Sequence, residues 1–256
     1  MLPYWQHSFI ISPMSYLIKL KELLMDALFP PLCLNCGKNL AGAEKNDGIC
    51  LDCLSKIVIH RTFFCPICRA RLPENKKICH KSSPYLLGAV TNYDDLAKNL
   101  IHRLKYDSWS RLKKPISVIL RSYLKNLQFG VLSDNFFKNY IVIPIPIHKN
   151  RERERGFNQA ELIGRIIAEE YGLPLENKIL IRAKETKSQA ELKNWEQRKE
   201  NLESAFKIAD SADLKNKNVI LVDDVYTSGA TINEAAKVLK SAGCKKIIAF
   251  VIAKTR

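Results

Sequence analysis

The feature that most constrains the fold is an apolar run that ends in two carboxylates, at 219–224. Its four consecutive apolar residues, three of them β-branched, are typical of a strand buried on both faces of a parallel sheet. Helical spacing resumes over 232–242, and Gly243 predicts the end of that helix. The segment therefore predicts a strand, a loop and a helix of an α/β fold.

The loop between this strand and helix has the chemistry of a phosphate site. Ligands bind beyond the carboxyl ends of strands in open α/β sheets, where Asp223 and Asp224 fall. The loop from Thr227 to Thr231 offers backbone N–H groups, hydroxyls and a helix N-terminus, which suit a phosphate monoester. Adjacent carboxylates would accept hydrogen bonds from vicinal hydroxyls. A sugar diol with a 5-phosphate matches both halves.

The run Leu221-Val-Asp-Asp-Val-Tyr-Thr-Ser-Gly-Ala-Thr231 resembles the phosphoribosyl pyrophosphate (PRPP) signature of type I phosphoribosyltransferases. The resemblance implies that the acid pair holds the ribose hydroxyls, that the loop holds the 5-phosphate and that Mg2+ accompanies PRPP. A plain solvated Asp-Asp turn is the alternative, but it does not need the hydroxyl-rich tail. With Asp223 and Asp224 as the catalytic pair, the expected PRPP contacts are Asp223, Asp224, Val225, Tyr226, Thr227, Ser228, Gly229, Ala230 and Thr231.

The chain of 256 residues carries a formal charge of +15, so an anionic partner is plausible. Between residues 56 and 125 there are 15 basic and 4 acidic side chains, which places the excess outside the second half. Within 98–125, Tyr106 and Trp109 are interleaved with the basic residues, a composition that suits single-stranded DNA. Two helices with solvent-facing cations are the alternative. The candidate contacts are Arg103, Lys105, Arg111, Lys113 and Lys114.

Several classes of protein are excluded by what the sequence lacks. The sequence contains no run of 18 or more apolar residues, so it predicts no membrane span. Residues 1–12 carry no Lys or Arg, so a secretory signal is not expected. Residues 1–13 are either a native tail or precede a start at Met14. Leu17, Leu20 and Leu24 then predict an amphipathic helix, ended by Pro30-Pro31, that packs on the body of the protein.

Seven of the eight cysteines fall within 47 residues, mostly as Cys-x-x-Cys pairs. Two residues between thiolates let both reach one metal from a tight turn, so the first two pairs predict a zinc ribbon with a structural ion. Disulfides are the alternative, disfavoured without a secretory signal. An adjacent Cys-His pair is awkward for chelating one ion, which leaves the number of ions, one or two, open. The first set is Cys33, Cys36, Cys50 and Cys53; the candidates for a second are Cys65, Cys68, Cys79 and His80.

A second anion site is predicted after the strand at 140–146, where a basic loop leads through Gly156 into a helix. Pyrophosphate is the anion that the 227–231 loop leaves unaccounted for, and Lys149 and Arg155 are the best donors. An ion-paired helix start is the alternative, because Glu residues alternate with the cations. A polar segment from Arg182 onward, including Lys184, is expected to fold over a bound diphosphate and exclude water.

Together these motifs resemble the ComF family of bacterial DNA uptake and competence proteins. The residues that carry the resemblance are Pro144-x-Pro146, Arg155-Gly-Phe-Asn-Gln159, Arg182, Gln189, Arg198, Asn201, Ala205-Phe206 and the Asp-Asp loop, behind a cysteine-rich N-terminus. The resemblance implies a cytoplasmic protein that acts in natural transformation or DNA utilisation, on or near incoming single-stranded DNA. Two hypotheses follow: a phosphoribosyltransferase, or a PRPP- or nucleotide-sensing module without turnover that binds single-stranded DNA or a helicase partner.

The predicted architecture is a type I phosphoribosyltransferase-like parallel sheet with helices on both faces, preceded by a small cysteine-rich zinc-ribbon module. The expected division is 1–32 for the tail and helix, 33–83 for the zinc ribbon and 84–256 for the phosphoribosyltransferase-like domain. A single strand, 246–253, follows the helix after the loop, so the acceptor pocket is expected to be roofed by 84–140 or by the zinc ribbon.

Overall fold

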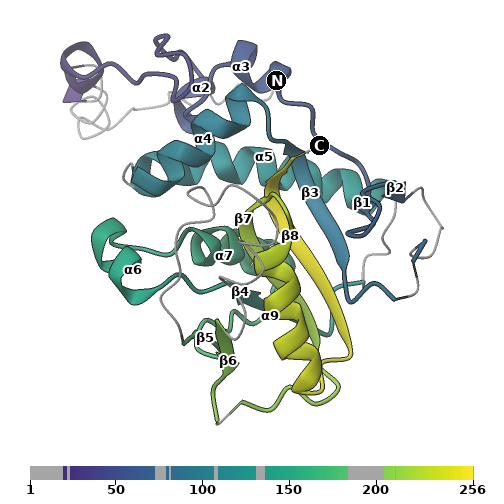
Figure 1. Ribbon diagram of the computed structural model, residues 1–256. Helices are drawn as coiled ribbons and strands as arrows, with labels where there is room; N and C mark the ends of the chain where they lie inside the picture. The colour runs from purple at the N-terminus through teal and green to yellow at the C-terminus, as the bar shows by residue number, and fades with distance from the viewer. Residues whose placement is uncertain are drawn as a thin grey trace, which may run out of the picture.

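The computed structural model describes residues 20–21, 24–72, 79–80, 82–106, 109–130, 136–183, 205–210 and 212–255, with the backbone alone at 106, 109–111 and 128–130. Figure 1 shows an α/β body with the cysteine-rich segment on one side of it. The predicted α/β class, with a mostly parallel sheet and a cysteine-rich N-terminal part, is confirmed.

A six-stranded sheet with the order β2-β1-β3-β8-β7-β4 forms the centre of the molecule. Its parallel part consists of β3 (Leu86–Asn92), β8 (Lys246–Lys254), β7 (Asn218–Tyr226) and β4 (Tyr140–Pro144). As predicted, Val219 to Val222 in β7 are fully buried, because this strand lies between two neighbours and has helices or strands over both faces. The carboxyl end of β7 is therefore held between the ends of β4 and β8.

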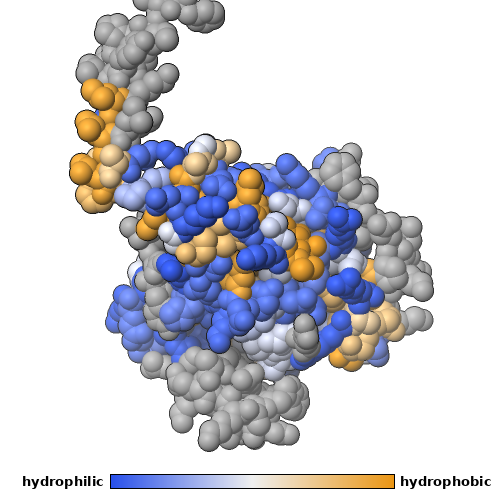
Figure 2. All heavy atoms as spheres, turned by 90° about the horizontal axis from the view of Figure 1, so that it is seen from above, coloured by the Kyte–Doolittle hydropathy of each residue, from blue (hydrophilic) through white to orange (hydrophobic). Residues whose placement is uncertain are grey.

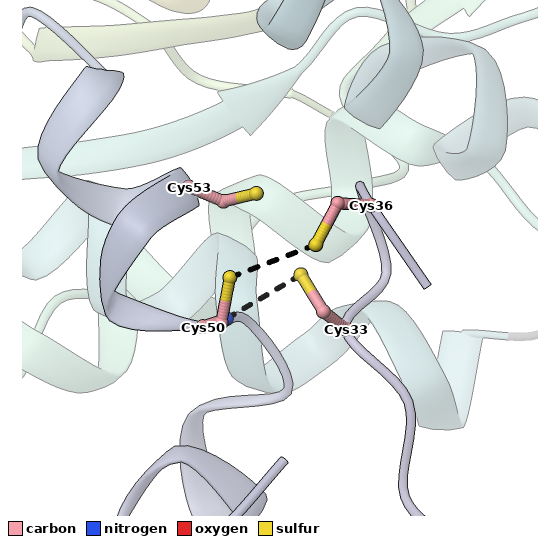
Figure 3. Close-up of side chains that lie close together, drawn as sticks. All are labelled: Cys33, Cys36, Cys50 and Cys53. Atoms are coloured by element: carbon pink, nitrogen blue, oxygen red, sulfur yellow. Dashed lines mark hydrogen bonds between the residues drawn. The ribbon is translucent and has the colours of Figure 1, made fainter. Parts of the chain in front are cut away.

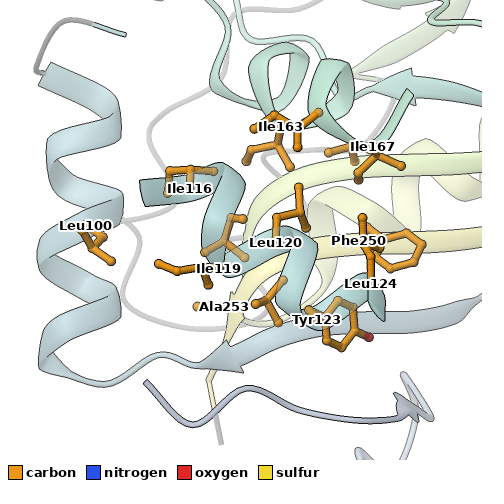
Figure 4. Packing of buried hydrophobic residues seen from close by; sticks show 14 of the residues in the cluster. Leu100, Ile116, Ile119, Leu120, Tyr123, Leu124, Ile163, Ile167, Phe250 and Ala253 are labelled. Carbon is orange, nitrogen blue, oxygen red and sulfur yellow. The ribbon is translucent and has the colours of Figure 1, made fainter. Parts of the chain in front are cut away.

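Three helices cover one face of the sheet: α4 (Asp95–Tyr106), α5 (Trp109–Gly130) and α7 (Gln159–Tyr171). Figure 4 shows Leu100 of α4, Ile119 of α5 and Ile163 of α7 packing toward the same core as Phe250 of β8. The other face carries α9 (Ala230–Ser241) and a two-stranded sheet of β5 (Leu180–Arg182) and β6 (Phe206–Ile208). The short helix α6 (Lys149–Arg155) lies between β4 and α7.

The cysteine-rich segment is joined to the main sheet rather than separate from it. It contains α2 (Glu44–Asp47), α3 (Leu51–Lys56), β1 (Phe63–Phe64) and β2 (Arg71–Leu72). The strand β1 pairs antiparallel with β3, so the sheet crosses the boundary expected between 83 and 84. Cys33, Leu34 and Ile49 belong to the same core as α4 and α5. The division into domains stays a prediction.

The helical residues near the N-terminus, 20–21 and 24–28, do not pack as predicted. Leu20, Leu24 and Leu28 are each more than half exposed, and Figure 2 shows apolar side chains gathered on this protruding segment. An ion pair between Asp26 and Lys45 links it to α2. The prediction of a helix packed on the body is therefore wrong for the described residues. Within the described part of the chain no helix is both long and apolar enough to cross a membrane.

Candidate functional site

A cavity of about 220 Å3 lies at the carboxyl edge of the parallel strands. Segments that are far apart in the sequence meet there: the residue after β3, the end of α4, the segment after β4, α6, the start of α7, the end of β5 and the 223–231 segment. The polar residues that line it are Tyr93, Lys105, Arg151, Arg155, Asn158, Gln159, Arg182, Asp223, Asp224, Thr227 and Thr231. This is the edge at which the sequence predicted a ligand.

The acid pair lies inside β7, near its carboxyl end, and the two carboxylates have different partners. Asp224 forms an ion pair with Lys105, whose Nζ lies 3.0 Å from Oδ2, and the Asp224 side chain is 15% exposed. Oδ1 of Asp223 accepts a hydrogen bond of 2.8 Å from the backbone N–H of Asp224. Burial, and next the charge of Asp224, raise the pKa of Asp223 to about 8. Asp224 is therefore paired with a cation, whereas the charged form of Asp223 would be stabilised by a further positive charge.

Lys105 is the residue whose position differs most from its prediction. The sequence suggested it as a nucleic-acid contact, with a solvent-facing cation as the alternative, but the last turn of α4 places it in the cavity lining. Burial lowers the pKa of Lys105, yet the charge and hydrogen bond of Asp224 outweigh burial and raise it overall. Lys105 therefore keeps its charge opposite the acid pair.

The other predicted nucleic-acid contacts remain outside the cavity. Lys113 and Lys114 are exposed on α5 and Arg103 is partly buried on α4, while the side chain of Arg111 lies outside the described residues. Lys184 also lies outside them, as do the other polar residues expected to close over a diphosphate between 184 and 204.

The loop after β7 is shorter than expected, because β7 continues to Tyr226 and α9 begins at Ala230. Gly229 has a φ of +79°, a left-handed conformation that favours glycine, and it forms the N-cap of α9. No acidic residue lies in the first turn of α9, so the positive end of its dipole is not neutralised there. Thr227 and Thr231 line the cavity. Ser228 and Gly229 lie between β7 and the first residue of α9, Ala230, and the Tyr226 side chain is buried on the α9 side of the sheet.

The segment expected to hold pyrophosphate is a helix, α6, not a loop. His148 caps it through a bond from Asn150 N to Nδ1, and Gly156 ends it in the left-handed conformation at φ 78°. Of the two donors expected for pyrophosphate, Arg155 lines the cavity, whereas Lys149 is exposed. Arg151, which the sequence reading passed over, lines the cavity because positions i and i+4 share a helix face. That spacing was the signal available for finding it.

Two further side chains help to shape the cavity next to α6. Arg182, at the end of β5, lines it and stacks over the Phe206 ring at 5.4 Å. Asn158 is buried, and its Nδ2 donates to the carbonyl of Ile145 while its Oδ1 accepts from Ala160 N at the start of α7. Asn158 thereby ties the segment after β4 to the N-terminus of α7. Tyr93 directly follows β3, so the carboxyl-edge rule accounts for its place in the cavity.

Seven of the eight cysteines, together with His80, form two compact clusters, and all eight are free thiols. In each cluster the ligand atoms all lie within 4.8 Å of one another. Figure 3 shows the thiols of the first cluster directed toward a common point, with Cys36 Sγ 3.7 Å from Cys50 Sγ. Tetrahedral zinc with Zn–S bonds of about 2.3 Å has S–S edges of about 3.8 Å, so these residues fit zinc.

The second cluster includes the adjacent Cys-His pair that seemed awkward in sequence. Cys79 Sγ and His80 Nδ1 lie 3.3 Å apart, and Cys65 Sγ is 3.5 Å from the same nitrogen. Cys68 Sγ is 3.3 Å from Cys79 Sγ. The fold therefore brings all four candidate ligands together, as a second structural zinc site requires.

Comparison with known proteins agrees with this arrangement. A model of the phosphoribosyl transferase domain matches residues 162–256, and a model of the double zinc ribbon domain matches residues 24–83. Competence protein F of Haemophilus influenzae is 28% identical over 222 residues, 84% of this chain and 93% of that protein. Competence protein ComFC of Streptococcus pneumoniae is 29% identical over 233 residues, 85% and 97% of the two chains. DNA utilization protein YhgH of Salmonella typhimurium is 26% identical over 231 residues, 88% and 98%.

Proposed function

Since this chain belongs to the ComF family, we propose that it binds PRPP with Mg2+ in the cavity at the end of β7 and transfers the phosphoribosyl group to an acceptor during DNA uptake or utilisation. The observation that carries the proposal is the composition of that one cavity. Two adjacent carboxylates and a phosphate-binding type of loop face four cations, Lys105, Arg151, Arg155 and Arg182. A ligand that carries a diol and several phosphates satisfies both the carboxylates and the anion-binding groups, which are the loop and the four cations.

Each part of the cavity has a separate task in this proposal. The loop from Thr227 to Thr231 and the N-terminus of α9 hold the 5-phosphate. Asp223 and Asp224 hold the ribose hydroxyls, directly or through a metal-bound water. The arginines of α6 and β5 hold the diphosphate. Tyr93 and Lys105 come from the 84–140 segment that the sequence predicted to roof the acceptor side.

The donor set suits Mg2+, which prefers carboxylate and phosphate oxygens. When bound with PRPP, Mg2+ would neutralise charge on the diphosphate. In the transfer, the bond from C1 of the ribose to the diphosphate oxygen breaks and its electron pair leaves with the diphosphate, while the acceptor supplies the pair for the new bond to C1. Three arginines stabilise the negative charge of the departing diphosphate: Arg151, Arg155 and Arg182. The protein therefore needs to supply little general acid–base catalysis.

The test is calorimetric titration of the full chain with PRPP in Mg2+, followed by an assay for pyrophosphate. We expect binding at one site per chain, weakened at least about tenfold by Asp223→Asn together with Asp224→Asn, because the hydroxyl contacts lose charge assistance. Unchanged affinity in that variant would dismiss the site. Steady release of pyrophosphate with an acceptor would establish an enzyme, and binding without release would favour the sensing alternative.

Lys105 gives this proposal its sharpest internal control. Lys105→Met should weaken PRPP binding about tenfold, since Asp224 loses the cation that pairs with it beside the proposed ribose hydroxyls. Lys113→Met, on the neighbouring helix α5 but exposed, should leave PRPP affinity within about twofold. Equal effects from both variants would show that overall charge, rather than this cavity, governs binding.

A sensing module that binds single-stranded DNA or a helicase partner is the second candidate. It is supported by the exposed basic side chains of α4 and α5, and the side of the molecule seen in Figure 2 is largely hydrophilic. Free thiols in two metal-type clusters suit the reducing cytoplasm. Filter binding of a single-stranded 40-mer should show a steep salt dependence that charge reversal of Lys113 and Lys114 flattens and Lys105→Met does not. Salt-independent binding would remove this candidate.

A further inference from the structure

We propose that the second zinc cluster positions the phosphate loop, through the turn from Cys65 to Arg69. The loop meant is 227–231, and the inference rests on the proposed binding of a sugar phosphate there. The second cluster then does more than stabilise its own ribbon: with zinc bound, it fixes the conformation of the 227–231 loop.

Two hydrogen bonds join the turn directly to the start of the loop. The Tyr226 hydroxyl donates to the carbonyl oxygen of Pro66, 3.1 Å away. Arg69 Nη2 donates to the carbonyl oxygen of Thr227 at 3.2 Å. Pro66 lies between the two cysteines of the pair and Arg69 follows the second of them. Any movement of the turn therefore displaces both of its bonding atoms, the Pro66 carbonyl oxygen and Arg69 Nη2, relative to the start of the loop.

The buried ring of Tyr226 transmits the position of the turn into the loop. A Cβ on Gly229 would lie 2.4 Å from the Tyr226 hydroxyl oxygen, so the loop backbone rests directly on this side chain. The Tyr226 hydroxyl also lies 3.4 Å from that of Tyr85, which donates to Asn233 Oδ1 in α9 at 2.7 Å. One hydroxyl thus links the turn, the loop and the helix that follows it.

The turn depends on its metal ligands for its shape. It is closed by hydrogen bonds from Arg69 N to Cys65 O and from Cys65 N to Ala70 O. Arg69 has a φ of 59°, a left-handed conformation that costs energy for a residue other than glycine. The adjoining strands β1 and β2 have two residues each. A segment with so little regular structure needs bound metal to hold such a turn.

The first cluster provides a matched comparison because it contacts a different element. Its residue Asn35 accepts a hydrogen bond of 2.9 Å from Asn99 of α4, away from the loop. Cys36 and Cys68 are both exposed ligands and each is the second cysteine of its pair. Substitution of Cys36 should therefore remove the zinc ion of the first cluster, and substitution of Cys68 should remove that of the second.

The experiment compares Cys68→Ser, Cys36→Ser and Arg69→Met with the wild-type full chain. Zinc content, PRPP affinity in Mg2+, and hydrogen–deuterium exchange of the 225–231 peptide are measured. We expect Arg69→Met to retain zinc, to lose affinity about two- to tenfold and to speed exchange of the peptide by a similar factor, the range for one net hydrogen bond. Cys68→Ser should give at least these changes, and Cys36→Ser should leave both within about twofold.

The outcomes separate this inference from the proposed function. If the wild-type chain does not bind PRPP, the proposed function fails, and the exchange data still decide whether the turn holds the loop. Wild-type exchange and affinity in Arg69→Met would overturn the inference, and so would equal effects from Cys36→Ser and Cys68→Ser. Should Cys68→Ser fail to fold, Arg69→Met keeps the test decisive because all four ligands remain.

Discussion

At the acid pair, two neighbouring carboxylates experience opposite surroundings. Asp224 is neutralised by Lys105, whereas Asp223 faces burial and the charge of its neighbour. A raised pKa means that the folded protein disfavours the charged form of Asp223. Ionising Asp223 in the free site therefore costs free energy, and a bound cation or a pair of hydroxyl groups would lower that cost. Such a cost is expected at a position that serves binding rather than stability.

This cost predicts how stability changes with pH. Between the ordinary aspartate value of 3.8 and about 8, the folded chain retains a proton that the unfolded chain has released. The free energy of unfolding should therefore fall as pH rises through that window. Asp223→Asn keeps an acceptor for Asp224 N and removes the titration, so it should be more stable than wild type by about 1–3 kcal/mol at pH 9 and nearly equal at pH 4.

Urea denaturation of both proteins across this pH range checks the prediction. Asp213→Asn, at a carboxylate in the exposed loop before β7, is the matched control and should leave the pH profile unchanged. Parallel profiles for wild type and Asp223→Asn would contradict a raised pKa at this residue.

At the scale of the element, α6 shows how a helix selects among similar cations. Its seven residues contain Lys149, Arg151, Arg153 and Arg155, alternating with acidic or polar residues. In an extended loop all of them could turn toward one anion, but in a helix only positions near i and i+4 share a face. Arg151 and Arg155 therefore line the cavity, and Lys149 is directed to solvent.

This arrangement predicts unequal effects of substitutions within one short helix. Arg151→Met and Arg155→Met should each weaken PRPP binding about tenfold, because each loses a charge-assisted contact to the diphosphate. Lys149→Met should change it less than about twofold. The measurement is calorimetry with PRPP and Mg2+, with circular dichroism to confirm that helix content is unchanged. Equal losses from all three variants would mean that α6 acts only through its net charge.

For the whole molecule, the main result is that the cysteine-rich segment and the α/β body share a core. The strand β1 continues the sheet, and buried residues of the first cluster pack with those of α4 and α5. Tyr226 and Arg69 add polar links at the second cluster. The two parts that family models match separately are thus joined by packing and hydrogen bonds in this chain.

Shared packing predicts that zinc removal acts on the entire protein. Wild type should contain about two zinc ions per chain, and a strong chelator should lower the temperature of one common unfolding transition, because the ribbon cannot be lost without exposing the core. Differential scanning calorimetry with and without chelator, at matched protein concentration and with the zinc content of each sample determined, measures this. Two separate transitions, with the upper one unmoved by chelator, would show instead that the body folds independently.

Local patterns in the sequence were sufficient for the strand at 219–222, the loop and helix after it, the Cys-x-x-Cys turns and the α/β class. Each depends on residues within a few positions of one another, where strand pleating, helical periodicity and the reach of a turn act directly. They were not sufficient for Lys105 opposite Asp224, for Tyr226 on Pro66, or for His80 beside Cys65. Those contacts join distant segments, and their geometry depends on how helices and strands pack around the common core, which no short-range spacing encodes.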